Sequence, residues 1–233
     1  MNQLIERLMC FGLTRQEATI YLGLVQNGDL TGYEAAKQTG ISRSNAYNAL
    51  AGLVDKGAAY TEEGTAVKYH AVCIEEFCSN KIRALEETKF WLLESMPKQK
   101  EEAEGYLTIT GDRHIQDKIR NMIQSARQRM YLSMTERFVR MFEKEMTEAA
   151  GQGKKVVVIT DRPLEYADIM IYQTKEKAQQ IGIIADSAHV LTGEFGRGEA
   201  STCLYSGQKN FVQVFKDSMR NEIELIRIMK GEQ

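Results

Sequence analysis

Residues 31–57, TGYEAAKQTGISRSNAYNALAGLVDKG, decide the fold of the N-terminal part of the chain. Thr31 and Glu34 form an S/T-x-x-E capping box, which predicts the start of a helix. Gly40 ends that helix, because glycine takes positive φ at no steric cost. Ser42 begins a second helix, which we expect its hydroxyl to cap. Two short helices joined by a tight turn are the outline of a helix-turn-helix, which favours binding to duplex DNA.

The second of these helices has two distinct faces. The apolar residues that share one face are Ala46, Leu50 and Leu53 or Val54. The other face is polar and begins where a recognition helix reaches base edges and phosphates. The residues predicted to contact DNA here are Thr31, Tyr33, Ser42, Arg43, Ser44, Asn45, Tyr47 and Asn48. Helical bundles also contain such turns and solvated polar faces, so this segment alone leaves DNA binding and plain packing equally open.

The flanks of the segment favour a winged helix. Thr14 and Glu17 form a second capping box upstream, which predicts another helix. Downstream, residues 58–61 and 66–70 are strand-like and are separated by a turn-type sequence. Helices followed by such a hairpin make a winged helix, in which the hairpin touches DNA beside the recognition helix. Lys68 is the cation expected on this hairpin, and we expect it to contact DNA.

Several short runs in this region follow a pattern shared with a known family. They are Phe11-Gly12-Leu13-Thr14-Arg15-Gln16-Glu17-Ala18, Tyr21-Leu22, Gly40-Ile41-Ser42-Arg43-Ser44-Asn45-Ala46-Tyr47, Leu50, Leu53 and Lys56-Gly57. The pattern resembles the N-terminal domain of TrmB-like transcriptional regulators and covers nearly all of residues 4–72. This resemblance implies a DNA-binding repressor or activator with a C-terminal effector domain.

The composition bounds the class of protein. The 233 residues are 43% hydrophobic and 27% charged, which describes two modest globular domains. The chain lacks the ~18 consecutive apolar residues of a membrane span, and its first residues lack a signal-peptide pattern. We therefore expect a cytoplasmic protein with no membrane contact. The four cysteines show no CxxC spacing, so we expect neither a metal site nor a cofactor.

The charge of the N-terminal region argues against strong DNA binding. Residues 1–72 carry six basic and seven acidic side chains, whereas a DNA-binding domain usually has a basic face. We expect binding to depend on a local patch, on helix N-termini that face phosphates and on two copies of the chain. The near-neutral charge also keeps open a winged helix that binds protein instead of DNA.

Residues 74–96 predict a long helix that Pro97 ends. A coiled-coil seam is indicated by residues that recur along it in steps of four and three, which are Cys78, Ile82, Leu85, Lys89, Leu92 and Met96. The residues predicted to bind a second copy are Cys78, Ile82, Leu85, Leu92 and Met96. Phe77 and Trp91 are expected to widen this seam. A helix that packs on its own domain is the alternative.

The remaining residues alternate between strand and helix patterns, which predicts a mixed α/β sheet with helices on its faces. Strand-like runs lie at 106–110, 130–134, 155–160, 182–185, 190–191 and 201–205, and helical runs at 112–126, 136–150 and 210–229. Their order resembles the phospholipase-D-like C-terminal domain of the same family, with looser motifs. The predicted architecture is an α+β winged helix-turn-helix domain (1–72), a linker coiled-coil helix (73–104) and an α/β phospholipase-D-like domain (105–233).

The chain departs from the H-x-K-x4-D motif that phospholipase-D-like enzymes use. With Asp186 as the motif aspartate, Gln179 holds the histidine position and Ile181 the lysine position. Neither side chain can do the chemistry, so we expect no catalytic residues. A phosphodiesterase-like enzyme with a DNA-targeting domain remains the alternative.

A small-molecule effector, such as a sugar, is the partner expected for the C-terminal domain. Polar residues in loops and at strand ends are the candidates to bind it. They are Thr135, Asp161, Arg162, Asp186, Ser206 and Asn210. Any single one of them is more readily explained as an ordinary turn or cap residue. The sequence thus predicts a dimeric, effector-controlled regulator that binds double-stranded DNA.

Overall fold

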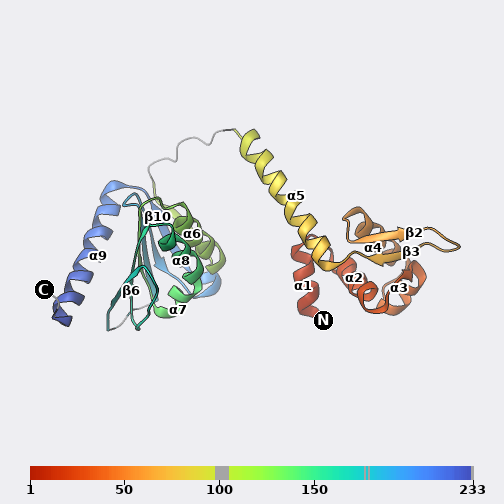
Figure 1. Cartoon of the computed structure of the whole chain (residues 1–233), viewed down its shortest axis with the longest axis horizontal. Helices are drawn as coiled ribbons and strands as arrows, with labels where there is room; N and C mark the ends of the chain where they lie inside the picture. Colours follow the sequence, from red (N-terminus) through yellow and green to blue (C-terminus); the bar gives the residue numbers. More distant parts are fainter. Residues whose placement is uncertain (98–104, 176, 178, 232–233) are drawn as a thin grey trace. The chain divides into compact units, whose positions relative to one another are not determined.

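The computed structural model describes residues 1–97, 105–175, 177 and 179–231, which form two compact units, Met1–Lys98 and Gln99–Gln233 (Figure 1). The segment 98–104, predicted to bridge the two domains, lies outside the described residues. Across the described ranges, no helix is long and apolar enough to cross a membrane.

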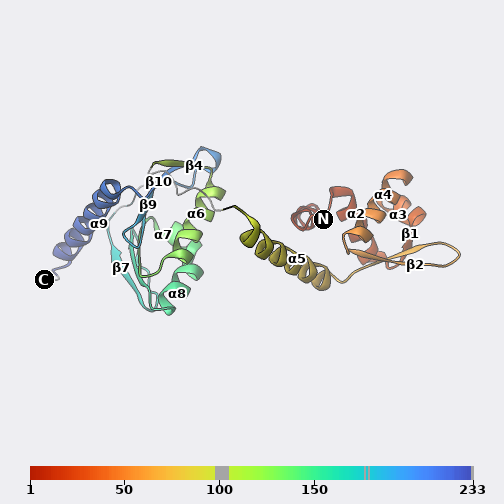
Figure 2. The ribbon, with the colours of Figure 1, turned by 90° about the horizontal axis from the view of Figure 1, so that it is seen from above.

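The N-terminal unit is a winged helix followed by a long helix (Figure 2). Its helices are α1 (Asn2–Cys10), α2 (Arg15–Asn27), α3 (Gly32–Thr39), α4 (Arg43–Asp55) and α5 (Ile74–Ser95). Its antiparallel sheet has the order β1-β3-β2, with β1 (Leu30–Thr31), β2 (Ala59–Glu62) and β3 (Lys68–Ala71). The predicted helix-turn-helix and hairpin are confirmed. The strand β1 was not predicted, because two residues are too few to show an alternating pattern.

Both predicted capping boxes are present, at Thr14 and Thr31. Gly40 ends α3 in the left-handed region, at φ 70°. The predicted cap at Ser42 is wrong, because its side chain makes no cap hydrogen bond although the residue does precede α4. In α2 and α3 the third helical residue is a glutamate that completes the box, whereas in α4 it is Asn45, which cannot.

The first turn of α5 belongs to the winged-helix core. Phe77 is 1% exposed, and its ring centroid lies 6.1 Å from that of Tyr21 and 6.3 Å from that of Phe11. The Tyr21 hydroxyl donates to the Val72 carbonyl at 2.7 Å. The prediction that Phe77 widens an intermolecular seam is therefore wrong, since its own unit buries it. Cys78 also packs against this core.

The C-terminal unit is a seven-stranded mixed sheet with helices on both faces (Figure 1). Its elements are β4 (Leu107–Thr110), α6 (Asp112–Ser125), β5 (Arg129–Ser133), α7 (Glu136–Val139), η1 (Arg140–Phe142), α8 (Glu143–Gly151), β6 (Lys155–Thr160), β7 (Ile169–Gln173), β8 (Gln180–Ala185), β9 (His189–Glu194), η2 (Gly198–Ala200), β10 (Thr202–Ser206) and α9 (Lys209–Lys230). The strand order is β4-β10-β9-β8-β5-β6-β7, in which β5, β6 and β7 are parallel. The predicted mixed α/β domain is confirmed.

The two faces of this sheet bury different cores. Helices α6 and α8 cover the larger one, which includes Met130, Leu132 and Val158, and α9 covers a smaller one around Ile159 and Ile184. The strand β7 was not predicted because its sequence, IMIYQ, is apolar on both faces and so lacks alternation. The helix predicted over 136–150 is interrupted by the 3₁₀ turn η1.

Candidate nucleic-acid interface

The exposed face of α4 gathers the polar residues that the sequence singled out. Ala46, Ala49, Leu50 and Leu53 are buried against the other helices, whereas Arg43, Ser44, Asn45, Tyr47 and Asn48 are exposed. Because Ser42 does not cap α4, the first amides of this helix are open to an acceptor outside the chain. A phosphate group is a suitable acceptor at such a helix N-terminus.

Arg43 is held in place by Tyr33 of α3. Its guanidinium carbon lies 4.7 Å from the centroid of the Tyr33 ring, and that ring is itself 50% exposed. An exposed cation–π contact of this kind is worth about 0.5–1 kcal/mol. Within the described residues, no carboxylate forms an ion pair with Arg43. The arginine at the start of α4 is therefore oriented without being neutralised.

Tyr47 of α4 lies against the backbone at the start of α3. A Cβ atom built on Gly32 would come within 2.4 Å of the Tyr47 ring. Glycine at position 32 thus allows the aromatic ring to approach, although half of the ring stays exposed. The contact fixes the direction of Tyr47 on the recognition face. Sequence reasoning identified Tyr47 but gave no role to Gly32.

The sheet brings Lys68 to the same surface. Lys68 of β3 pairs in register with Thr31 of β1 and Glu62 of β2, and Thr31 directly precedes Gly32 under the Tyr47 ring. The Thr31 amide and hydroxyl, together with the Lys68 charge, lower the pKa of the exposed Glu34 carboxyl. Residues of α3, α4 and β3 predicted to contact DNA therefore lie on one continuous surface.

Some carboxylates of this unit lie against an arginine or a histidine ring of the same unit. Glu6 pairs with Arg15, and the His70 ring nitrogens lie 2.6 Å from an Asp29 oxygen and 3.1 Å from a Glu62 oxygen. The Glu6–Arg15 pair removes one cation with one anion, so it leaves the balance of charge in this unit unchanged.

Glu17 fixes α4 against α2. Its carboxylate accepts from Lys56 Nζ at 2.6 Å and from the Thr14 amide at 2.6 Å, and the residue is 6% exposed. A Cβ atom on Gly52 would come within 2.2 Å of Glu17 Oε1, so α4 packs directly on this carboxylate. Burial alone raises the pKa of Glu17, but the bonds from Lys56 and Thr14 outweigh it and lower the pKa below its ordinary value.

The six candidate effector residues do not come together in one pocket. Thr135 and Asp161 follow the C-terminal ends of β5 and β6, where Asp161 accepts from the Glu136 amide at 2.7 Å. Asp186 lies at the opposite edge, because β8 runs antiparallel to β5. Ser206 donates to the Gly105 carbonyl at 2.9 Å. Arg162 and Asn210 are exposed in a loop and in the first turn of α9.

Asp186 has a structural role in this edge. Its carboxylate accepts from the amides of Arg127, Gln128 and Arg129 at 2.7–2.9 Å. Burial raises the pKa of Asp186, but these three amides outweigh it and lower the pKa below its ordinary value. The residue thus fastens the loop between α6 and β5.

The positions that would carry phospholipase-D chemistry have other partners. Gln179 accepts from Arg197 Nε at 3.2 Å, and Ile181 is 2% exposed in the main core. Among the described side chains, no group of His, Cys, Asp and Glu is arranged to hold a metal ion.

Two family models match the chain in the order of its units. Residues 8–75 match the model described as sugar-specific transcriptional regulator TrmB, and residues 106–218 match the N-terminal subdomain of the TrmB effector-binding domain. The chain belongs to the TrmB family of transcriptional regulators. The predicted function, DNA-binding transcriptional regulation, is thereby confirmed.

Two curated proteins are similar to this TrmB-family chain. The protein YrhO of Bacillus subtilis strain 168 is 25% identical, over 98% of the chain and 87% of YrhO. The DNA-binding HTH-type transcriptional repressor TrmBL2 of Thermococcus kodakarensis is 26% identical, over 72% of each protein.

Solved structures similar to the chain fall into two groups. The structure of TrmBL2, described as an archaeal chromatin protein with a novel mode of DNA binding, is 20% identical and covers 96% of this chain and 98% of that one, with a TM-score of 0.49. Nuc from Salmonella typhimurium, a phospholipase D family member, is 13% identical and covers 50% of this chain and 93% of that one, with a TM-score of 0.39.

Proposed function

We propose that two copies of this TrmB-family chain bind duplex DNA through α4 and the wing, and that a small-molecule effector controls this binding from the C-terminal unit. The observation that carries the DNA interface is Arg43, which Tyr33 orients beside the uncapped amides of α4. In this arrangement α4 enters the major groove with its N-terminal residues toward the bases. The contact residues are those predicted above, from Thr31 to Asn48, with Lys68 on the wing.

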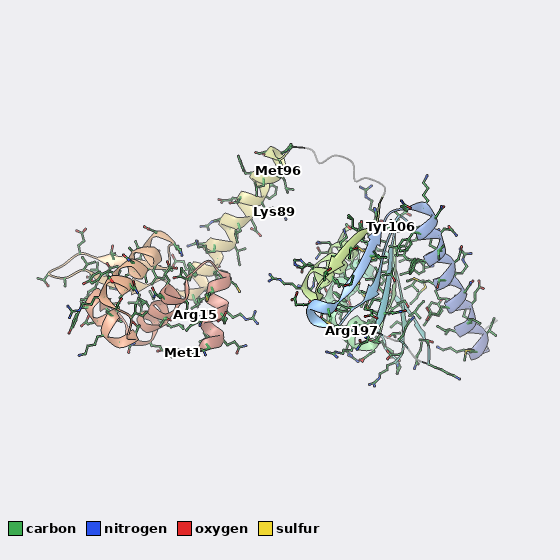
Figure 3. All side chains as sticks on the ribbon, turned by 180° about the vertical axis from the view of Figure 1, so that it is seen from behind. Met1, Arg15, Lys89, Met96, Tyr106 and Arg197 are labelled. Atoms are coloured by element: carbon green, nitrogen blue, oxygen red, sulfur yellow. The ribbon has the colours of Figure 1, made fainter. Side chains whose placement is uncertain are left out.

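Dimerisation is proposed to occur through α5. Ile82, Leu85, Leu92 and Met96 are 49%, 68%, 43% and 64% exposed. Figure 3 shows Lys89 on the part of α5 that extends beyond the winged helix, and Met96 directly after the end of this helix. These exposed apolar residues share one face of α5, with Lys89 between Leu85 and Leu92, and such a face marks an interaction surface. Cys78 is a weaker member of this seam, because it packs against its own unit.

The buried Phe77 suggests how a change in α5 reaches the DNA interface. Because its ring lies in the winged-helix core, a shift of the α5 seam moves the whole winged helix with it. In a dimer such a shift alters the separation of the two copies of α4, which must match the spacing of half-sites. An effector can shift the equilibrium between two dimer states with different separations of α4 only if it binds these two states with different affinities.

The C-terminal unit is proposed to regulate and not to catalyse. The two positions needed for phospholipase-D chemistry hold a glutamine and a buried isoleucine. A covalent phosphoryl intermediate needs a nucleophile that these side chains do not supply.

The DNA interface is tested by measuring the affinity of the full chain for the DNA upstream of its own gene, by fluorescence anisotropy at low salt. A guanidinium–base contact contributes about 1–3 kcal/mol, so Arg43→Ala is expected to weaken binding by about 5- to 150-fold. The matched control is Arg7→Ala on α1, which removes the same charge and is expected to bind like wild type. Wild-type affinity of Arg43→Ala would refute the interface. A wild-type chain that does not bind this fragment would favour a protein partner for the winged helix.

A further inference from the structure

A groove runs between α9 and the uncovered part of the C-terminal sheet. We name it the α9 groove; its volume is about 380 Å³. The charged residues that line it are Arg129, Lys155, Lys216, Arg220, Glu224 and Arg227. None of them belongs to the candidate effector set that the sequence indicated.

The fold assembles these charges from distant parts of the chain. Arg129 at the start of β5 and Lys155 at the start of β6 are neighbours in register in the parallel pair. The cations of α9 recur at helical spacing and therefore share one face of that helix, which packs over the sheet. Periodicity reveals the helical stripe alone, whereas the sheet register adds Arg129 and Lys155.

The groove also has an apolar floor with two tyrosines. On the sheet, Tyr131 of β5 lies in register between Ile184 of β8 and Val157 of β6, and Tyr172 of β7 and Met219 of α9 also line the groove. Arg227 donates to the Tyr172 hydroxyl at 2.8 Å, so this guanidinium is held at the wall of the groove. Such a combination of apolar surface with a few fixed polar groups is typical of small-molecule sites.

The lining of the α9 groove carries an excess of positive charge, whereas the chain as a whole is nearly neutral. Five cations and one carboxylate line the groove, although the whole chain has 30 basic and 32 acidic residues. Arg220 has Asp217 as an ion-pair partner at 3.1 Å. Cations at this density repel one another, and a bound anion relieves that repulsion.

We propose that the α9 groove binds a small molecule with a phosphate group on a ring-bearing body. The phosphate would contact the cations from β5, β6 and α9, and the ring would lie on the apolar floor between the tyrosines. The volume lies within the range of ~300–1,000 Å³ for ligand pockets, which favours a compact metabolite over a DNA strand. Its role as the effector rests on the function proposed above, whereas binding itself does not.

Isothermal titration calorimetry of the full chain, without DNA and in phosphate-free buffer, tests this site. The probes are glucose 6-phosphate and AMP, compared with glucose, adenosine and inorganic phosphate. We expect at least one phosphorylated probe to bind, and its unphosphorylated counterpart and inorganic phosphate to bind more weakly. Removing both lysines with Lys155→Gln and Lys216→Gln is expected to weaken that binding at least ~10-fold, because charge-assisted bonds to phosphate are lost.

The matched control removes two positive charges from the other side of the sheet, with Arg113→Gln on α6 and Lys144→Gln on α8. It is expected to bind the probe like wild type, and circular dichroism checks that both double variants are folded. The proposal is overturned if no phosphorylated probe binds, if the groove variant binds as tightly as wild type, or if both double variants weaken binding equally. If no probe binds and a separate assay shows that the groove variant loses affinity for an unrelated DNA duplex, the groove is a DNA-binding surface and the proposal is overturned. Because the calorimetry contains no DNA, a failed DNA interface would not change its result.

Discussion

Gly52→Ala is expected to destabilise the N-terminal unit, although alanine is the better helix former. The added Cβ atom would come within 2.2 Å of Glu17 Oε1. Because Glu17 is 6% exposed, its carboxylate cannot simply swing into solvent. Moving Oε1 away turns the carboxylate and disturbs the two bonds that Oε2 accepts at 2.6 Å, from Lys56 and from the Thr14 amide.

The magnitude follows from the interactions that are lost. The capping bond contributes about 1 kcal/mol, and a charged hydrogen bond such as the one from Lys56 contributes about 1.5–3 kcal/mol. Exchanging glycine for alanine in a helix returns about 1 kcal/mol. The net loss in the free energy of unfolding is therefore about 1.5–3 kcal/mol.

Gly23→Ala in α2 is the matched control with the opposite sign. Its Cβ atom would meet nothing closer than Thr39 Cγ2 at 3.5 Å, an ordinary contact, so a gain of about 0.5–1 kcal/mol in the free energy of unfolding is expected.

Hydrogen exchange measured by mass spectrometry separates the two units. It should show faster exchange in α4 for Gly52→Ala and slower exchange in α2 for Gly23→Ala. If Gly52→Ala were as stable as wild type, the buried Glu17 contact would not hold α4 in place. In a Glu17→Ala background the loss should disappear and Gly52→Ala should instead stabilise the unit by about 1 kcal/mol, since the two residues are in contact and alanine is the better helix former.

Three further predictions concern the DNA interface, the seam and the acid stability. Gly32→Ala is expected to displace the Tyr47 ring and weaken DNA binding in the anisotropy assay, with little change in melting temperature because the ring is half exposed. Leu85→Glu is expected to convert a dimer into a monomer in sedimentation velocity, since it places two glutamates across the proposed seam; an unchanged sedimentation coefficient would contradict the role of α5. Because the pKa of Asp186 is lowered from its ordinary value of 3.8, its contribution to stability is complete above that value and is lost as the pH falls through the lower folded-state pKa. Asparagine can adopt the positive φ of 51° at position 186, but it keeps only one acceptor oxygen for the three amides. In urea unfolding, Asp186→Asn should therefore be less stable than wild type at neutral pH. Its stability should also decline less than that of wild type as the pH is lowered.

Local signals explain why the N-terminal fold was predictable. The capping boxes at Thr14 and Thr31 and the left-handed Gly40 depend on residues three or fewer positions apart, and the structure contains all three. The failed cap at Ser42 shows the limit of such signals, because serine is a favourable cap residue and yet its hydroxyl makes no cap hydrogen bond here. Phe77 was assigned to the wrong surface because periodicity shows that a residue is apolar, without showing which neighbour buries it.

The sequence by itself determined the helix-turn-helix, its wing, the long α5 and a mixed α/β domain, since periodicity and turn residues encode these elements locally. It also indicated the exposed face of α4 that carries Arg43. Only the tertiary structure decided that Asp186 fastens a loop, that the effector candidates lie at opposite edges of a sheet, and that Arg129 and Lys155 join the cations of α9 in one groove. The physical reason is that strand order and register place residues side by side that are far apart in the chain, and neither is encoded in a short stretch of sequence.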